Sequence, residues 1–280
     1  RAIGNISMTE KQRDRVDGSL AGKGPVTRFW QRKYEVVVGF YRFAIARGYA
    51  LDIPLPHRAP KPARAFVPHI YSHDELRRLL KATAACDNPH SRIDSETCRT
   101  LILLLYGAGL RISEALALTL ADVDLSSAML LIHTSKFYKT RLVPLGLDLT
   151  RVLKAYATWR AMQHPSALEG PFFVSRTGAP LTRRAAEYTF SRLRLRAGVL
   201  RHDGARYQPR LHDLRHAFSV HRLLAWYRQG ADIQRLLPQL ATYLGHVHLA
   251  ATQRYLTMTP ELLQEACQRF ERYAGEVARG

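Results

Sequence analysis

Cysteine is scarce in this sequence of 280 residues, which contains only Cys86, Cys98 and Cys267 and no C-x-x-C pair. An odd number without paired spacing argues against a disulfide framework and a cysteine-based zinc site, and it fits a reducing cytoplasm. The sequence also has no apolar run long enough to span a bilayer and no visible secretory leader. Because it begins Arg-Ala-Ile rather than with Met, we expect the native start to be missing.

Acidic residues are also few. Asp and Glu total 23 against 42 Lys and Arg, which gives a formal charge of +19 and a pI of about 10.3. Such an excess favours a polyanionic partner, most often nucleic acid, because each neutralised phosphate releases counterions. A membrane surface is the competing polyanion, but the chain has no Lys-rich anchoring terminus. With 46% hydrophobic residues the chain can bury a core, and its length predicts one or two domains.

Proline marks a boundary in the first quarter of the chain. Residues 27–48 carry apolar and aromatic side chains at helical spacing, whereas residues 52–70 contain five prolines and read as an extended linker. Ser72, with Glu75 three positions later, predicts a capping box at the start of the next helix. We therefore predict a helical domain over residues 1–60, incomplete at its N-terminus, a linker over 61–70 and a second domain over 71–280.

The second domain reads as mostly helical. Residues 128–134 and 141–145 predict two strands joined by the polar turn SKFYKT, and residues 171–175 predict a third. Pro238 should interrupt its helix. The fold class is therefore mainly α with a small antiparallel β-sheet (α+β), and helices are predicted over 182–197, 212–228, 231–243, 249–256 and 260–274.

The stretch LHDLRHAF, residues 211–218, contains the densest group of chemically active side chains. His212, Arg215 and His216 fall at i, i+3 and i+4, so they share one face of a helix. A metal site at the two histidines would lack the Glu of H-E-x-x-H, and Arg215 would repel a cation. Histidines packed against a neighbouring helix remain the ordinary alternative, so other segments must decide.

Three further stretches carry candidate residues. GLRISEALAL places Arg111 where a Gly-containing turn enters a helix, which is a good position for an anion. TSKFYKTRLVPLG places Lys136 at the tip of the predicted hairpin. YLGHVHLAATQRYL supplies His246 after a Gly turn and Tyr255 nine residues later. Taken singly, each has an ordinary explanation: a surface arginine, a solvated turn and a core tyrosine.

Together these segments resemble the tyrosine recombinase (phage integrase-like) family, including its Xer-type and transposon-associated members. The match runs from about residue 70 to 260, and the family's hallmark residues occur in the family's order. The resemblance implies a two-domain architecture, with a helical core-binding domain before the catalytic domain. The stretch from residue 230 to 246 departs from the common pattern by about one extra helical turn. The six matching positions are Arg111, Lys136, His212, Arg215, His246 and the nucleophile Tyr255.

The resemblance implies a phosphoryl transfer that needs neither metal nor cofactor. Arg111, Arg215 and His246 would hold the scissile phosphate, and Tyr255 would attack it to give a 3′-phosphotyrosyl link and a free 5′-hydroxyl. A phenol ionises only near pH 10 (about 10 in model compounds), so a base is required, and His212 is expected to supply it. Lys136 would protonate the departing 5′-oxygen. Glu114, Asp213 and His216 are expected to support these groups.

The expected partner is double-stranded DNA with an inverted-repeat core site, bound by a tetramer of this chain or of related recombinases in the bacterial cytoplasm, at the nucleoid. Residues 259–274 form an amphipathic helix that docks either on its own domain or on a neighbouring protomer. The basic residues expected to contact DNA are Arg28, Arg32, Lys33, Arg42, Lys139 and Arg141.

Three other functions compete. A type IB topoisomerase shares the same Arg-Lys-Arg-His-Tyr chemistry, but a short chain with a small first domain favours a recombinase. A DNA-binding protein with a decayed site is disfavoured because all six positions are filled. A metal-dependent hydrolase would have to use His212, His216, His246 and His248.

Overall fold

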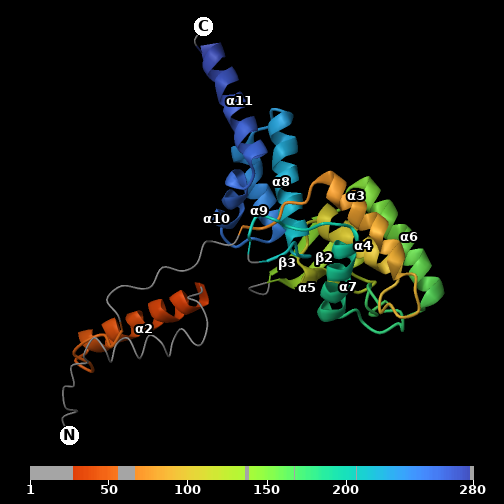
Figure 1. The fold of residues 1–280 in the computed structure, drawn as a ribbon, viewed down its shortest axis with the longest axis horizontal. Helices are drawn as coiled ribbons and strands as arrows, with labels where there is room; N and C mark the ends of the chain where they lie inside the picture. Colours follow the sequence, from red (N-terminus) through yellow and green to blue (C-terminus); the bar gives the residue numbers. More distant parts are fainter. Residues whose placement is uncertain (1–27, 56–66, 136–138, 167, 206, 278–280) are drawn as a thin grey trace. The chain divides into compact units, whose positions relative to one another are not determined.

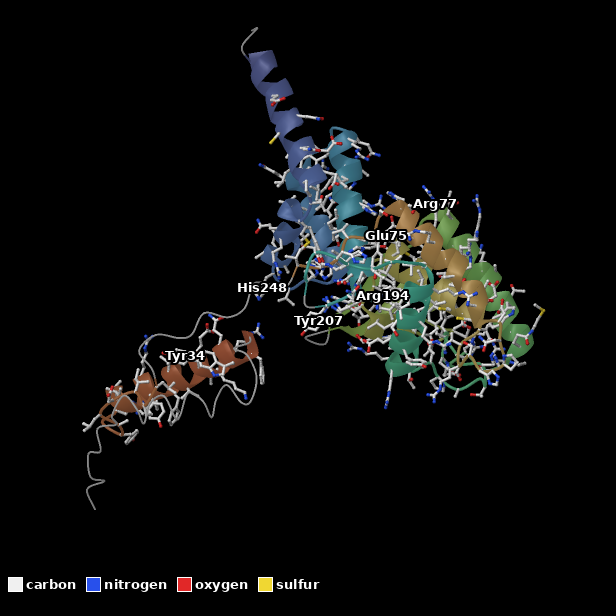
Figure 2. The ribbon with its side chains drawn as sticks, in the orientation of Figure 1. Tyr34, Glu75, Arg77, Arg194, Tyr207 and His248 are labelled. Atoms are coloured by element: carbon white, nitrogen blue, oxygen red, sulfur yellow. The ribbon has the colours of Figure 1, made fainter. Side chains whose placement is uncertain are left out.

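The computed structural model describes residues 28–55, 67–135, 139–166, 168–205 and 207–277. The chain divides into two compact units, residues 1–66 and 67–280. The described part of the first unit contains the helix α2 (Arg28–Ala46), where Trp30 is buried and stacks on Tyr34 at a ring distance of 5.6 Å (Figure 2). Within the described residues no helix is long and apolar enough to cross a membrane.

The second unit is built mainly from helices, as the sequence predicts (Figure 1). The first of them is fixed by the predicted capping box, since Ser72 accepts from the Glu75 N–H and Glu75 accepts from the Ser72 N–H. The elements are α3 (His73–Ala82), η1 (Thr83–Cys86), α4 (Ser95–Gly107), α5 (Ile112–Ala117), β1 (Val123–Asp124), β2 (Met129–Ser135), β3 (Lys139–Pro144), α6 (Leu147–Gln163), α7 (Arg183–Arg196), α8 (Asp213–Arg228), α9 (Ile233–Leu244), α10 (Ala250–Gln253), η2 (Arg254–Thr257) and α11 (Pro260–Val277).

The sheet is antiparallel with the order β1-β2-β3, and β2 and β3 form the predicted hairpin. The prediction of a third strand over 171–175 is wrong, because the third strand is the two-residue β1. Residues 171–175 make only isolated bridges, at Pro171 and Val174. Their apolar run serves a different purpose: Phe172 and Phe173 are buried and pack around Tyr156, each at a ring distance of 5.3 Å.

The expected interruption at Pro238 is also wrong, because α9 runs through this residue. Proline removes one intrahelical hydrogen bond, but the apolar face of α9 compensates by burial. Leu237, Leu240 and Leu244 from this face are each at most 6% exposed. The helix ends at Gly245, whose φ of +67° lies in the left-handed region that favours glycine.

Two hydrophobic clusters meet on α8. Leu214 and Ala217 belong to the larger cluster, which contains α3, α4, α6, α7 and the sheet. Phe218 and Leu223 belong to the smaller cluster, which α8 shares with α9, η2 and α11. In Figure 1 the helices α8, α9, α10 and α11 group together at one end of the unit. Residues 212–216, at the start of α8, therefore lie where the two clusters join.

Candidate active site

Glu114 forms the centre of a cluster of arginines. The turn before α5 passes through Gly109 at a φ of +58°, which turns the chain so that Arg111 precedes the helix and Glu114 lies in its first turn. Glu114 accepts hydrogen bonds from the Arg111 backbone N–H at 3.0 Å and from the Arg111 guanidinium. It also accepts two from Arg141 on β3, at 3.1 and 2.9 Å. One buried carboxylate thus fixes two guanidinium groups from separate elements.

Arg215 is held more deeply, at 2% exposure. Its Nη1 donates to the Gly109 carbonyl at 2.7 Å and its Nη2 donates to the Leu244 carbonyl at 2.6 Å. Burial and the charge of Arg111 lower the pKa of Arg215 to about 10, so the group stays cationic at neutral pH. Its Nη1 lies 3.9 Å from Glu114, which places three cations around one anion.

The same three arginines cap the carbonyl end of α9. Arg141 donates from Nε to the Tyr243 carbonyl, Arg215 to that of Leu244 and Arg111 to that of Gly245, at 3.0, 2.6 and 3.0 Å. The last carbonyls of a helix lack intrahelical partners and carry a partial negative charge. Three guanidinium groups on three successive carbonyls therefore satisfy this helix end and fix the residue that follows, His246.

His246 faces the segment that carries Tyr255. Its Nδ1 lies 2.7 Å from the buried Thr252 hydroxyl, and its ring stacks on Tyr255 with an interplanar angle of 25° and a ring distance of 6.1 Å. Burial, together with the charges of Arg215, Arg111 and Arg141, lowers the pKa of His246 to about 4. The imidazole is therefore neutral at pH 7, and in the tautomer in which Nδ1 accepts from Thr252 its Nε2 is a donor.

Tyr255 lies in η2 and is 3% exposed. Its hydroxyl lies 3.2 Å from the Nδ1 of His216, one residue after Arg215 on α8. Burial and the neighbouring charges of His212 and Arg215 lower the pKa of His216 to about 3. The predicted base His212 stands just before α8, with its ring perpendicular to that of His216 at 5.0 Å. Among the described residues, the contact of the Tyr255 hydroxyl is with His216.

The other predicted support residue, Asp213, acts on the turn before α8. It is 1% exposed and accepts from the Arg210 backbone N–H at 3.0 Å and from the Arg210 guanidinium at 2.9 Å. This carboxylate in the first turn also suits the positive end of the helix dipole. Asp213 thus fixes the start of the helix that presents Arg215 and His216.

A basic cleft of about 630 Å³ opens beside the cluster. Arg111 and His212 line it, as does Arg194 of α7, which Figure 2 labels. Arg194 donates to the Val199 carbonyl and to Gln208, so this wall is braced from within. The cleft is also lined by Arg183, Glu187, Arg210, Ser113 and Ser191.

The residues predicted to contact DNA are placed differently from one another. Arg32, Lys33 and Arg42 are exposed on α2, and the Lys33 ammonium lies 4.8 Å above the Phe29 ring. Arg141 does not face solvent as expected: its guanidinium pairs with Glu114 and is 11% exposed. Lys136, the predicted hairpin acid, lies outside the described residues, as do the side chains of Arg28 and Lys139.

Sequence reasoning missed three contributors to this arrangement: Arg141 as a partner of Glu114, Thr252 as a partner of His246, and the α9 carbonyls as acceptors. Arg141 is visible in sequence only as one more basic residue in a hairpin. Thr252 precedes Tyr255 by three positions, which puts it on the same side of a helical turn and is the one local indication available. The carbonyl acceptors leave no sequence signal at all.

A metal role for the histidines finds no support in the geometry. Within the described residues no group of three or more His, Cys, Asp or Glu side chains could hold a metal ion. Burial first, and then the charges of nearby arginines, lower the pKa values of His212, His216 and His246. Such a site suits an anion.

Comparison with known proteins agrees with this geometry. A protein of Sinorhizobium fredii that carries the name integrase/recombinase y4rB is 40% identical over 250 residues, which cover 87% of this chain and 78% of that protein. The tyrosine recombinase XerD of Caulobacter vibrioides is 32% identical over 255 residues, with 90% and 77% covered.

Solved structures share the fold at lower identity. The XerH site-specific recombinase in its post-cleavage complex with a palindromic difH substrate superposes with a TM-score of 0.65 at 19% identity, covering 93% of this chain and 72% of that one. The Tn1549 transposon integrase bound to transposon right end DNA gives 0.66 at 18% identity, covering 94% and 84%. Residues 70–261 match the model of the phage integrase family. The chain therefore belongs to the phage integrase family, the tyrosine recombinases.

Proposed function

We propose that this chain breaks and rejoins DNA strands at a specific site, with Tyr255 as the nucleophile and the cluster around Glu114 as the phosphate-binding site. The observation that carries the proposal is the convergence of Arg111, Arg215, His246 and Tyr255, from four separate segments of the chain, near one end of α9. Phosphoryl transfer asks a protein mainly to position groups and to stabilise charge on the non-bridging oxygens. Fixed guanidinium groups beside a stacked Tyr and His meet that demand.

The reaction is a transesterification in which bonds are exchanged and no energy source is consumed. The Tyr255 Oη–P bond forms as the P–O5′ bond breaks, so the 3′ end becomes attached to the protein. The phenol proton passes to a base, for which the α8 histidines are the candidates, and O5′ takes a proton from an acid, expected to be Lys136. The 5′-hydroxyl of a partner strand then reverses the attack, which exchanges the strands.

The finer partner assignments rest on the same proposal. The substrate is duplex DNA with inverted repeats, bound through the basic cleft and the exposed cations of α2, by a domain over 1–60, a linker over 61–70 and a catalytic domain over 71–280. Two DNA sites are held by four protomers at the bacterial nucleoid. XerH, for comparison, is described with a palindromic substrate.

The position of α11 bears on how such an assembly would form. Leu262 is fully buried in the smaller cluster, and Arg228 of α8 pairs with Glu265 at 2.8 Å. The first turns of α11 therefore dock on their own domain. This leaves the later turns, which carry the exposed Glu271, as the part that is able to reach a neighbouring protomer.

The test is trapping of the covalent intermediate. Nicked suicide duplexes with randomised inverted repeats are incubated with the protein in EDTA, and DNA attached to protein is recovered under denaturing conditions. We expect adducts from the wild type and none from Tyr255→Phe. The matched control is Tyr243→Phe, which removes a nearby hydroxyl bonded to the Pro144 carbonyl and should leave adduct formation intact.

The sequences recovered decide the type of reaction. Enrichment of one inverted repeat supports recombination, whereas adducts without sequence preference indicate a topoisomerase. Adducts that persist in Tyr255→Phe would exclude this residue as the nucleophile. Absence of adducts from the wild type at every duplex concentration overturns the proposal.

A further inference from the structure

Helix α8 carries two histidine–tyrosine pairs of the same kind. His216 Nδ1 lies 3.2 Å from the Tyr255 hydroxyl, and His221 Nδ1 lies 2.8 Å from the Tyr106 hydroxyl. Burial lowers the pKa of both imidazoles, to about 3 and about 4. The pairs differ in place: the first lies beside the arginine cluster, whereas His221 stacks on His73 of α3 at a ring distance of 4.5 Å.

A neutral imidazole has one N–H donor and one acceptor nitrogen. The phenol hydroxyl can donate or accept, and in the tautomer that carries the hydrogen on Nε2 it donates to the His216 Nδ1 at 3.2 Å. Protonation of Nδ1 is opposed in the resting site first by burial and then by the positive charges among the groups that face the ring. They are His212, Arg210 and Arg215 on the α8 side, and Tyr255 and Arg254 on the η2 side. In that tautomer the hydroxyl proton of Tyr255 points at the lone pair of the His216 Nδ1.

His212 lacks this contact. It precedes the first turn of α8 and lines the cleft. Its ring packs perpendicular to that of His216 at a ring distance of 5.0 Å. A base must reach the proton it removes, within about 3.2 Å or through one water. The Nδ1 of His216 meets this distance, at 3.2 Å from the Tyr255 hydroxyl. The ring of His212 packs on His216 instead.

We propose that His216 accepts the hydroxyl proton of Tyr255 as the Oη–P bond forms, and that His212 acts on the phosphate side of the cleft. The assignment rests on the proposed function, since it requires Tyr255 to be the nucleophile. The proton passes from Oη to Nδ1 while the P–O5′ bond breaks, and O5′ receives its proton from the general acid. In the reverse step Nδ1 returns the proton to Oη.

The phosphate itself prepares this transfer. Among the cationic groups that oppose protonation of His216 is Arg215, which is proposed to bind the scissile phosphate together with Arg111. An anion bound there offsets their charge and makes Nδ1 a stronger proton acceptor only when DNA is in place. The tyrosine, which is buried in the free protein, is then activated only in the complex with DNA.

The test is the pH dependence of adduct formation by the full chain in a single turnover. His216→Asn keeps a polar atom near the position of Nδ1 but cannot take up a proton, and His221→Asn is the matched control on the same helix. Rates are measured from pH 6 to 9.5 with saturating protein on a suicide duplex, and DNA affinity is measured separately. General base catalysis is worth about 10²–10⁴-fold, so we expect His216→Asn to be slower by about a hundredfold or more at pH 7.

The pH profile separates proton transfer from simple support. Without a base the phenol must ionise by itself, so the rate of His216→Asn should rise with pH and approach that of the wild type near pH 9. A loss that stays constant over the whole range indicates a merely structural role and overturns the proposal. So does a wild-type rate in His216→Asn, or a pH-dependent loss that appears in His212→Asn instead.

A second measurement covers poor folding of the variant. A fluorinated tyrosine with a more acidic phenol is placed at position 255, in both the wild type and His216→Asn. We expect it to restore activity in the variant far more than it changes the wild type, and equal effects in the two backgrounds would overturn the proposal. If the wild type forms no adduct at all, the proposed function fails first, and this assignment falls with it.

Discussion

The two halves of the site are held together by different means. The half proposed to bind the phosphate, called the phosphate-binding half, is an ionic lattice in which Arg111 and Arg141 are hydrogen-bonded to Glu114, Arg215 lies 3.9 Å from it, and all three reach the end of α9. The half that carries the proposed nucleophile, called the nucleophile half, is held by single hydrogen-bond contacts, with His216 on Tyr255 and Thr252 on His246. The two halves therefore differ in how they are held: the arginines share one carboxylate and one helix end, while the Tyr255 hydroxyl depends on one imidazole.

The largest effect on stability is expected in the phosphate-binding half, from removal of the Glu114 charge. Glu114→Gln leaves three guanidinium groups around an uncharged amide, and loss of one partner from a buried ion pair costs about 3–5 kcal/mol in the free energy of unfolding. Urea unfolding monitored by circular dichroism measures this. Adduct formation should fall as well, because the arginines lose their common anchor.

The matched control for this change is Glu187→Gln on α7. Glu187 pairs with Arg183 at 2.7 Å, but both side chains are about half exposed or more, so the loss should stay below about 1 kcal/mol. Equal losses at Glu114 and Glu187 would show that the cluster around Glu114 is no more important to stability than a surface pair.

Acid should loosen the two halves in sequence. Burial lowers the pKa of His216 to about 3 and that of His246 to about 4, and it lowers the pKa of His212 as well. A histidine whose pKa is lower in the folded state gives stability that is present above its unfolded value near 6.5 and is lost as the pH falls. Between its unfolded and folded pKa values, each such group changes the free energy of unfolding by about 1.4 kcal/mol per pH unit.

Glu114 should respond only in stronger acid. Burial alone would raise its pKa, but hydrogen bonds from Arg141 and from the Arg111 backbone N–H lower it to about 2. Its contribution is thus present above about pH 4.5 and is lost toward pH 2.

The measurement is the urea midpoint from pH 8 to 3. His216→Asn should flatten the slope between pH 6.5 and 4.5, and Glu114→Gln the slope below 4.5. His221 adds to the first slope in both proteins. A profile unchanged by His216→Asn would contradict the pKa assigned to this group.

The steric fit of Gly245 offers a finer test of the first half. Gly245 has a φ of +67°, and a Cβ there would lie 2.8 Å from the Arg141 Nη1. Gly230 has the same φ, but a Cβ there meets nothing within 4 Å. Gly230→Ala should therefore cost only the backbone strain of about 1–2 kcal/mol, whereas Gly245→Ala should cost more and should also slow adduct formation.

Thermal melts and adduct rates of the two alanine variants measure the difference. Equal melting temperatures would show that Arg141 moves aside freely, which would contradict its tight placement between Glu114 and the Tyr243 carbonyl. A normal adduct rate in Gly245→Ala would show that the end of α9 is not needed to place Arg111.

The sequence predicts those features of the molecule that depend on the residues of a single element. The helices over 182–197 and 212–228 correspond to α7 and α8 within one residue at each end, the hairpin is confirmed, and Ser72 caps α3 as expected. These features depend on local periodicity and capping. The run over 171–175 misleads because buried aromatic residues look alike in a strand and in a packed loop.

At the site, the sequence predicts candidate residues but not the contacts between them, because these contacts join different elements. Six positions could be chosen from their order in the chain, but their contacts depend on which elements meet. Arg141 reads as a DNA contact because nothing in its hairpin reveals Glu114, 27 positions earlier. His216 and His212 differ by one helical turn, and only the placement of η2 determines which of them contacts Tyr255.

The smallest effect is expected at Thr252, in the nucleophile half. The Thr252 side chain is fully buried and its hydroxyl lies 2.7 Å from the Nδ1 of His246, so it holds the imidazole ring in its orientation. Thr252→Val keeps the shape and removes that partner, which should cost about 1 kcal/mol in stability. Thr150→Val is the control: Thr150 of α6 is also buried, and its hydroxyl donates to the carbonyl of Gly146, which directly precedes the helix. The two variants should lose similar stability, but only Thr252→Val should slow adduct formation, by a few-fold, because only there does a lost hydroxyl release a group proposed to bind the phosphate. If both variants keep the wild-type rate, His246 is held well enough by the end of α9, and the nucleophile half is more rigid than its single contacts suggest.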